Sequence, residues 1–148
     1  MTLPTPKTLP ILPKFDAISV GDTLAPLTTE PISRLTLALY AGASGDHNPI
    51  HVDLDFARRA GMDDVFAHGM LSMAYLARLL TDWVPQSAIR SYEVRFVALT
   101  HVGEAITCNC EVLEKIEHSG EQRVRVALTA ANLAGVVKLS GEAVVALP

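Results

Sequence analysis

The chain has 148 residues, of which 49% are apolar and 19% are charged, and this balance is typical of one soluble globular domain with a buried core. Its formal net charge of -4, with scattered Lys and Arg, argues against nucleic acid as a partner. No apolar run approaches the roughly 20 residues that span a bilayer, and the N-terminus lacks the pattern of a secretory signal. We therefore expect a cytoplasmic protein without a membrane partner.

The first predicted elements follow a proline-rich stretch. Prolines recur through residues 1–14, which favours an extended arm, and the folded domain is predicted to cover residues 15–148. A short strand is predicted over Thr23–Thr29. Ser33 is a typical N-cap residue, and it predicts a helix over Arg34–Ala43. This helix leads directly into the most polar part of the chain.

A polar, turn-forming loop comes next, with the sequence Ser-Gly-Asp-His-Asn-Pro-Ile-His over residues 44–51. Its glycine frees the backbone, its Asp and Asn side chains can bond back to the backbone, and its proline pushes Asn48 toward an extended conformation. We expect the loop to present Asp46, Asn48 and His51 from a constrained backbone.

Two helices are predicted beyond the loop. Asp53 is the expected N-cap of a short helix over Leu54–Ala60, and Gly61 ends it. A longer helix is predicted from Met70 to about Val84. Apolar residues cover nearly its whole circumference, so we expect this helix to be buried.

From residue 88 onward the apolar period becomes alternating, which is typical of half-buried strands. Turns are predicted at residues 118–120 and 132–135, where turn-forming residues gather. The expected inward-facing residues, strand by strand, are Tyr92, Val94, Phe96 and Ala98; Ile106, Cys108, Cys110 and Val112; Val124, Val126, Leu128 and Ala130; and Val137, Leu139, Gly141, Ala143 and Val145. The predicted fold class is therefore α+β, with an antiparallel sheet wrapped around a central apolar helix. Open sheet edges favour pairing into a dimer.

The cysteines do not indicate a disulfide or a metal site. Cys108 and Cys110 lie two apart on the same face of one predicted strand, which disfavours a disulfide between them. No second cysteine pair accompanies them, so we predict buried free thiols. Metal binding by histidines and a carboxylate is an alternative, but the spacings match no known ligand pattern. The residues that it would use are Asp46, His47, His51 and His68. We therefore expect no metal and no cofactor.

The loop carries residue types that suit the addition of water to a double bond. Asp46 and His51 are an acid and a base that could share a water molecule, and Asn48 could orient it without titrating. Hydration beside a carbonyl also needs a donor for the enolate oxygen, and the backbone N–H of Gly69, at the start of the long helix, is the candidate. On spacing alone, a capping turn explains the loop as well as catalysis does. His68 is expected to be structural.

The loop resembles the signature of the MaoC-like dehydratases, the R-specific enoyl-CoA hydratase (hydratase 2) family. The resemblance continues through Ala67-His68-Gly69-Met70 and Val94-Arg95-Phe96. It implies a single hot-dog fold and a homodimer, or a larger oligomer, with a substrate tunnel near the subunit interface. It also implies reversible syn hydration of a trans-2-enoyl thioester, carried by CoA or acyl carrier protein, to a (3R)-3-hydroxyacyl thioester.

Carried over by position, the resemblance makes Asp46 and His51 the catalytic dyad, with the acid and base roles left open. Asn48 becomes the polar companion of the dyad, and Gly69 supplies the oxyanion-stabilising amide. The chain departs from the family pattern at the turn that ends in Gly103-Glu104, which we expect to lie away from the dyad. Candidate contacts for the phosphates of the thioester carrier are Arg90, Arg95, Arg123, Arg125 and Lys138. Alternatives are a non-catalytic or partner subunit of a heterodimeric dehydratase and a hot-dog acyl thioesterase.

Overall fold

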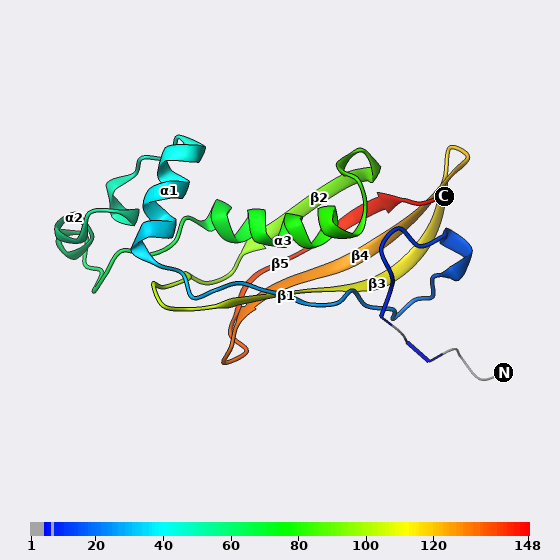
Figure 1. Cartoon of the computed structure of the whole chain (residues 1–148), viewed down its shortest axis with the longest axis horizontal. Helices are drawn as coiled ribbons and strands as arrows, with labels where there is room; N and C mark the ends of the chain where they lie inside the picture. Colours follow the sequence, from blue (N-terminus) through cyan, green and yellow to red (C-terminus); the bar gives the residue numbers. More distant parts are fainter. Residues whose placement is uncertain (1–4, 7) are drawn as a thin grey trace.

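The fold is built on a five-stranded antiparallel sheet with the strand order β1-β3-β4-β5-β2 (Figure 1). The computed structural model describes residues 5, 6 and 8–148. The strands are β1 (Leu27–Thr28), β2 (Ile89–Phe96), β3 (Ile106–His118), β4 (Glu121–Asn132) and β5 (Val137–Ala146). The predicted antiparallel sheet is confirmed, and β1 and β2 are its two edges.

Turn chemistry sets the register of the long hairpins. At the tip between β3 and β4, the φ angles are 52° at Ser119 and 77° at Gly120, as a type I′ turn requires. The next turn closes where the side-chain oxygen of Asn132 accepts the Val136 N–H at 2.8 Å. Both predicted turns are therefore present, and they align three long strands, with buried side chains that alternate along β4, the first half of β3 and the end of β5.

A close approach between β2 and β5 depends on one glycine. Gly141 lies opposite Val94 in the ladder that joins the two strands. A Cβ at Gly141 would lie 1.9 Å from the carbonyl oxygen of Glu93, so any side chain would force the strands apart. The glycine keeps β2 paired with β5 and thereby places the end of β2 beside the start of the long helix.

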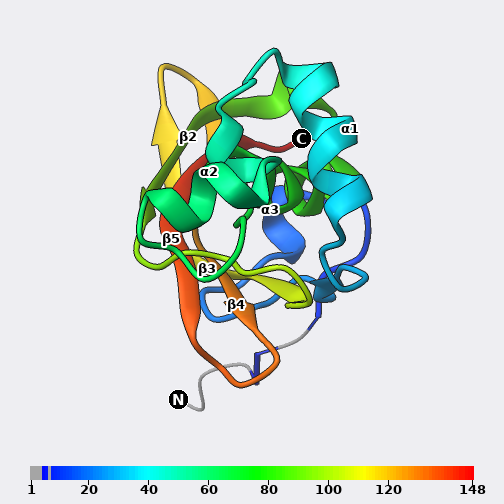
Figure 2. The same ribbon diagram turned by 90° about the vertical axis from the view of Figure 1, so that its left-hand side faces the viewer.

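Three α-helices accompany the sheet: α1 (Arg34–Ser44), α2 (Leu54–Arg59) and α3 (Gly69–Trp83). Short 3-10 turns cover Phe15–Ala17, Pro49–His51 and Gln86–Ala88. The predicted N-caps are both present, because Ser33 Oγ accepts the Thr36 N–H at 3.1 Å and the Asp53 carboxylate accepts the Phe56 N–H at 3.0 Å. Helices α1 and α2 lie at one end of the molecule, in front of α3 in Figure 2. None of the helices in the described residues is long and apolar enough to cross a membrane.

Helix α3 lies along one face of the sheet and forms the core with it (Figure 1). Its buried residues are Leu71, Ser72, Leu76, Leu79, Leu80 and Trp83. Tyr92 on β2 ties the two layers together, because its hydroxyl donates to the Met73 carbonyl at 2.6 Å. The expected burial of the helix on all sides is wrong for a single chain, since Met70 is 53% exposed and Ala74 is also exposed. One sheet covers only one side of a helix, and the outer side stays open.

The strand expected over Thr23–Thr29 is regular only at β1. Pro26 has no N–H to donate, and residues before it contact β3 through single links, such as the bridge between Thr23 and Glu111. The described part of the N-terminal arm lies against this segment. Leu9 is buried, and its N–H donates to the Thr23 carbonyl at 2.7 Å. Residues 1–4 and 7 of the predicted arm lie outside the described residues.

Candidate active site

The polar loop is held by a chain of short hydrogen bonds between its own residues. Gly45, with φ of 76°, ends α1, and the Asp46 N–H then donates to Ser44 Oγ at 3.1 Å. The Asp46 carboxylate accepts the Asn48 N–H at 3.2 Å, and the Asn48 side-chain oxygen accepts the Ile50 N–H at 3.1 Å. Asp46 and Asn48 are thus capping residues. Capping also fixes the turn that ends at His51, so the structural interpretation does not exclude the catalytic one.

His51 is 8% exposed, and the hydrogen bond at its Nδ1 determines its tautomer. Nδ1 lies 2.7 Å from the backbone carbonyl oxygen of Phe66. A carbonyl oxygen can only accept, so Nδ1 carries the proton, and in the neutral ring Nε2 keeps its lone pair. The ring of Phe66 also contacts the His51 ring edge-on, with the centroids 5.1 Å apart. His51 is therefore presented with Nε2 as its proton acceptor.

The carbonyl that orients His51 is itself held by the loop after β2. Phe66 forms an isolated antiparallel bridge with His101, and the Ala67 N–H donates to the Thr100 carbonyl at 2.9 Å. The turn that ends in Gly103-Glu104 begins at His101, where the Glu104 carboxylate accepts the His101 N–H at 2.7 Å. The expectation that this turn lies away from the dyad is therefore wrong. The residues at the start of this turn hold the Phe66–Ala67 peptide, whose carbonyl oxygen accepts the His51 Nδ1–H.

His68 lies in the site, although the sequence predicted a structural role for it and grouped it with Asp46 and His51 only in the metal-binding alternative. Its ring is 1% exposed and stacks on the His51 ring, with centroids 3.9 Å apart and an angle of 29° between the planes. Its Nε2 lies 3.2 Å from the backbone carbonyl oxygen of Asp46, and Tyr40 contacts the ring edge-on at 4.8 Å. Burial, followed by the nearby His51, lowers the pKa of His68 below its ordinary value, so the ring is neutral at pH 7. His47, by contrast, is exposed.

The structure brings Asp46, His51 and His68 together. One carboxylate oxygen and one ring nitrogen from each histidine all lie within 4.8 Å of one another, with Asp46 on the exposed side of the cluster. These three side chains are of types that can coordinate a divalent metal ion. However, His51 Nδ1 and His68 Nε2 each bond to a backbone carbonyl oxygen, which leaves one nitrogen of each ring for any other role. A carboxylate beside two imidazole rings is also a set of groups that can transfer protons.

The N-terminus of α3 supplies the candidate oxyanion donor. Gly69 is the first residue of the helix, so its N–H has no acceptor within the helix and lies at the positive end of the helix dipole. The Phe96 ring, 52% exposed, lies against Gly69, since a Cβ built there would be 2.9 Å from Phe96 Cε1. The absence of a side chain thus makes room for Phe96 beside the amide.

A cavity of about 370 Å³ lies next to this amide. Its lining residues are Phe66, Ala67, Gly69, Ser72, Phe96, Val97, Ala98, Leu99, Thr100 and Leu139. Most of these side chains are apolar, and the volume falls in the range of small-molecule sites. Phe66 and Gly69 connect the cavity to the dyad and to the oxyanion donor. An apolar chain attached to a reacting carbonyl could therefore lie in it.

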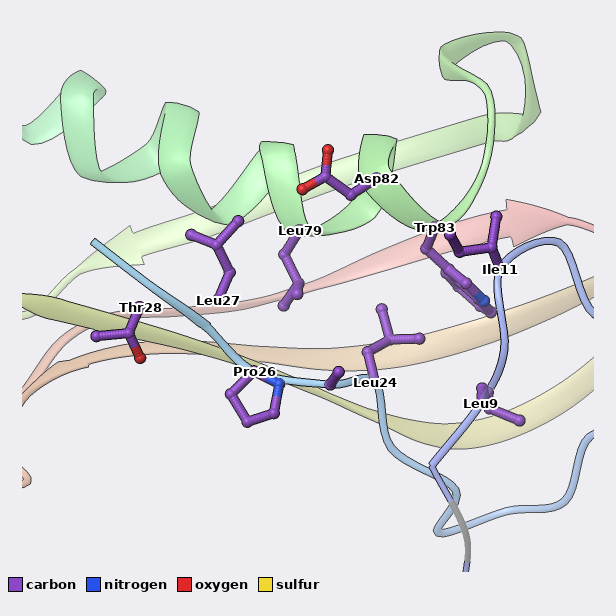
Figure 3. A pocket seen from close by; sticks show the side chains of 10 residues that line it. Leu9, Ile11, Leu24, Pro26, Leu27, Thr28, Leu79, Asp82 and Trp83 are labelled. Carbon is purple, nitrogen blue, oxygen red and sulfur yellow. The ribbon is translucent and has the colours of Figure 1, made fainter. Parts of the chain in front are cut away.

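A larger cavity, of about 410 Å³, lies toward the other end of α3 (Figure 3). It is lined by Leu9, Ile11, Leu24, Ala25, Pro26, Leu27, Thr28, Leu79, Asp82 and Trp83. Asp82 is the one titratable side chain among these residues, so the cavity has no base to pair with an acid. The cavity of about 370 Å³, rather than the larger one, therefore lies next to the candidate catalytic residues.

Most of the basic residues proposed to contact phosphate are already paired. Arg90 and Arg123 both bond to Glu121, and Arg125 bonds to Glu114 and Glu142. Lys138 is 4% exposed, with its Nζ 3.0 Å from the Glu104 carboxylate and 2.8 Å from the Leu99 carbonyl oxygen. Of these candidates, Lys138 is the least suited to contact phosphate, because its ammonium group is buried and already paired.

Comparison with known proteins agrees with this geometry. A family model for the MaoC like domain matches residues 17–133. The (R)-specific enoyl-CoA hydratase of Rhodospirillum rubrum is 31% identical over 140 residues, which cover 93% of this chain and 94% of that protein. The fatty acid synthase subunit beta of Saccharomyces cerevisiae is 33% identical over 136 residues, which cover 88% of this chain but only 6% of that protein. The chain belongs to the MaoC-like dehydratase family, as the loop motif predicted.

Solved structures support the same fold. The unliganded R-hydratase PhaJ1 from Pseudomonas aeruginosa has a TM-score of 0.78 and 31% identity, covering 91% of this chain and 85% of that chain. The (R)-hydratase from A. caviae, involved in PHA biosynthesis, has a TM-score of 0.77 and 26% identity, covering 89% of this chain and 98% of that chain. The predicted hot-dog fold is confirmed.

Proposed function

We propose that this protein is an (R)-specific enoyl-thioester hydratase that also catalyses the reverse reaction, the dehydration of a 3-hydroxyacyl thioester. One observation carries the proposal. The buried His51 donates its Nδ1–H to the Phe66 carbonyl, and its Nε2 has no hydrogen-bond partner among the residues that the structure describes, in a cluster that also holds the Asp46 carboxylate. Family membership and relatives named as hydratases and dehydratases support the same activity.

The reaction that these groups support begins with a water molecule held between Asp46 and His51. His51 Nε2 takes one proton from the water while its oxygen bonds to C3 of the enoyl chain. The electrons of the C2–C3 double bond move toward the thioester carbonyl and form an enolate, whose oxygen accepts the Gly69 N–H. The proton that His51 accepted passes to the Asp46 carboxylate, which delivers it to C2, so one water molecule supplies both the hydroxyl group and the new C–H bond and both side chains return to their starting state. Water bound on one face of the chain adds its oxygen and the proton on that same face, and dehydration reverses each step.

The acyl group has a candidate place beside the reacting carbonyl. A carbonyl oxygen at the Gly69 N–H would leave the chain next to the apolar cavity of about 370 Å³ that Gly69 helps to line. The carrier, either CoA or acyl carrier protein, would then extend toward solvent. Arg95 is exposed, and of the basic residues considered, it is the one without an ion pair in the described part of the chain.

A homodimer fits the surface around this cavity. Strand β2 is an unpaired edge, and large apolar side chains near it are exposed. They include Met70, Phe96, Val97 and Leu99. A second copy of the chain that paired along β2 would cover both the edge and these side chains. Sedimentation of the purified chain at several concentrations distinguishes a homodimer from a subunit that awaits a different partner.

The proposed activity is tested with the purified chain and crotonyl-CoA. We expect loss of the enoyl absorbance and formation of (3R)-3-hydroxybutyryl-CoA, identified by chiral chromatography. A thiol-reactive dye should detect no released CoA. Release of free thiol without a hydroxyacyl product would instead indicate the thioesterase alternative, and formation of the (3S) product would contradict the proposal.

A further inference from the structure

We propose that His68 is a positioning residue for hydration, which fixes the positions of His51 and Asp46 relative to the Gly69 amide. This inference rests on the proposed function and assigns a role to a residue whose sequence context indicated only a structural one. His68 touches no reacting atom in the proposed mechanism. Its contribution comes through the three groups that do.

The buried His68 side chain contacts both residues of the proposed dyad, His51 and Asp46. The face of the His68 ring stacks on His51 at 3.9 Å, and the His68 Nε2 lies 3.2 Å from the Asp46 carbonyl oxygen. The stack restricts rotation of the His51 ring, which the Phe66 carbonyl fixes only at Nδ1. The hydrogen bond holds the backbone of the residue whose carboxylate must meet the same water molecule.

The third connection runs through the backbone. His68 is the N-cap residue of α3, and the amide of the next residue, Gly69, is the candidate oxyanion donor. One side chain therefore links the acid, the base and the oxyanion donor, which come from two different segments of the chain. Misplacement of a reacting group by about 1 Å can lower the rate by about 100-fold. Loss of the His68 side chain should therefore lower kcat measurably.

The protonation of His68 follows from the same contacts. A carbonyl oxygen accepts at Nε2, so Nε2 carries the proton, while Nδ1 is buried and has no hydrogen-bond partner among the described residues. A second proton at Nδ1 would place a charge in the buried stack. The titratable groups that face the ring are His51, Asp46 and Tyr40. Burial and His51 oppose the charge more strongly than Asp46 favours it, so His68 remains neutral and leaves proton transfer to His51.

Two substitutions separate the two contacts. His68→Gln places an amide donor where Nε2 was but removes the ring, whereas His68→Phe keeps a ring but removes the donor. His47→Gln is the matched control, because His47 is an exposed histidine of the polar loop over residues 44–51. For crotonyl-CoA hydration, we expect each His68 variant to lower kcat by about 10- to 100-fold with KM within about threefold, and His47→Gln to match the wild type. Wild-type kcat in both His68 variants would overturn the proposal.

A merely structural role for His68 predicts a different pattern. In that case kcat per folded molecule, with the folded fraction measured by near-ultraviolet circular dichroism, would equal the wild-type value, and this result would also overturn the proposal. A second readout does not require activity. Nitrogen-15 NMR of histidine-labelled protein should show His51 with its proton on Nδ1 and His68 with its proton on Nε2. In His68→Gln, the His51 signals should change to a mixture of tautomers.

The two readouts keep this inference distinct from the proposed function. If the wild type hydrates no enoyl thioester, the proposed function fails, and the tautomer of His51 in the variants still decides whether His68 orients it. Unchanged His51 signals in both His68→Gln and His68→Phe would contradict the inference even if the wild type is an active hydratase.

Discussion

The ring of Phe96 lies against the backbone of Gly69, and a Cβ at Gly69 would be 2.9 Å from Phe96 Cε1. This contact joins the last residue of an edge strand to the first residue of the central helix. The Gly69 amide, which has no acceptor within the helix, therefore lies between the Phe96 ring, the apolar cavity and the proposed dyad.

Gly69→Ala should therefore lower activity without unfolding the protein. The new methyl group displaces the half-exposed Phe96 ring and crowds the N–H at which the enolate oxygen binds, so we expect kcat/KM to fall about 10- to 100-fold. Alanine also favours the helix by about 0.5–1 kcal/mol, so Tm should not fall. Gly42→Ala in α1 is the control, because nothing lies within 4 Å of its added Cβ. Full activity in Gly69→Ala would argue against an oxyanion donor at this position.

The ion pair between the half-buried Glu104 and the buried Lys138 should make stability depend on pH. Burial alone would raise the pKa of Glu104, but hydrogen bonds from the His101 N–H, the Asn132 amide and Lys138 together hold it below its ordinary value of 4.5. A carboxylate whose folded pKa is lowered contributes stability above its unfolded pKa and loses that contribution as pH falls through the folded pKa. Urea unfolding below pH 4.5 should thus show a smaller loss of stability in Glu104→Gln than in the wild type.

Two further variants complete this test. Lys138→Met leaves the Glu104 carboxylate without its cation and should cost about 3 kcal/mol at pH 7. Glu117→Gln, which changes an exposed carboxylate outside any ion pair in the described residues, is the matched control. Equal acid sensitivity of Glu104→Gln and the wild type would contradict the assignment.

The two cysteines should be unreactive in the folded protein. Burial is the main cause that raises the pKa of Cys108 to about 11 and that of Cys110 to about 12, so neither forms much thiolate at neutral pH. We expect a thiol-reactive dye to label neither cysteine in the native state and both in urea. Rapid labelling of native protein would show that this part of β3 opens readily, and it would also add background to the thioesterase assay.

Local sequence patterns predicted much of the fold because they act over a few residues. Alternation identified the strands β2 to β5, and Ser33 and Asp53 predicted the starts of α1 and α2 through caps that need only the next turn. The polar loop was also predicted as a constrained presentation of Asp46 and His51. Their proximity in space agrees with that prediction, while their catalytic role remains a proposal.

What the sequence did not predict depends on contacts between distant segments. His68 follows His51 by 17 positions, and only the packing of α3 against the loop stacks the two rings. The sequence suggested that Lys138 is an exposed cation, but in the folded sheet it is buried and paired with Glu104. The outer side of α3 stays open because a single chain supplies one sheet, so its apolar residues indicated burial that one copy does not provide.

The most direct test of the proposed dyad is the kinetics of two isosteric variants and their combination. Asp46→Asn keeps the oxygen that accepts the Asn48 N–H, and His51→Asn keeps a donor for the Phe66 carbonyl while removing Nε2. With crotonyl-CoA, we predict that each single variant lowers kcat at least about 100-fold while circular dichroism stays unchanged. The double variant should be no slower than the slower single variant, because the two groups act as a unit. Turnover close to that of the wild type in either single variant would contradict the dyad.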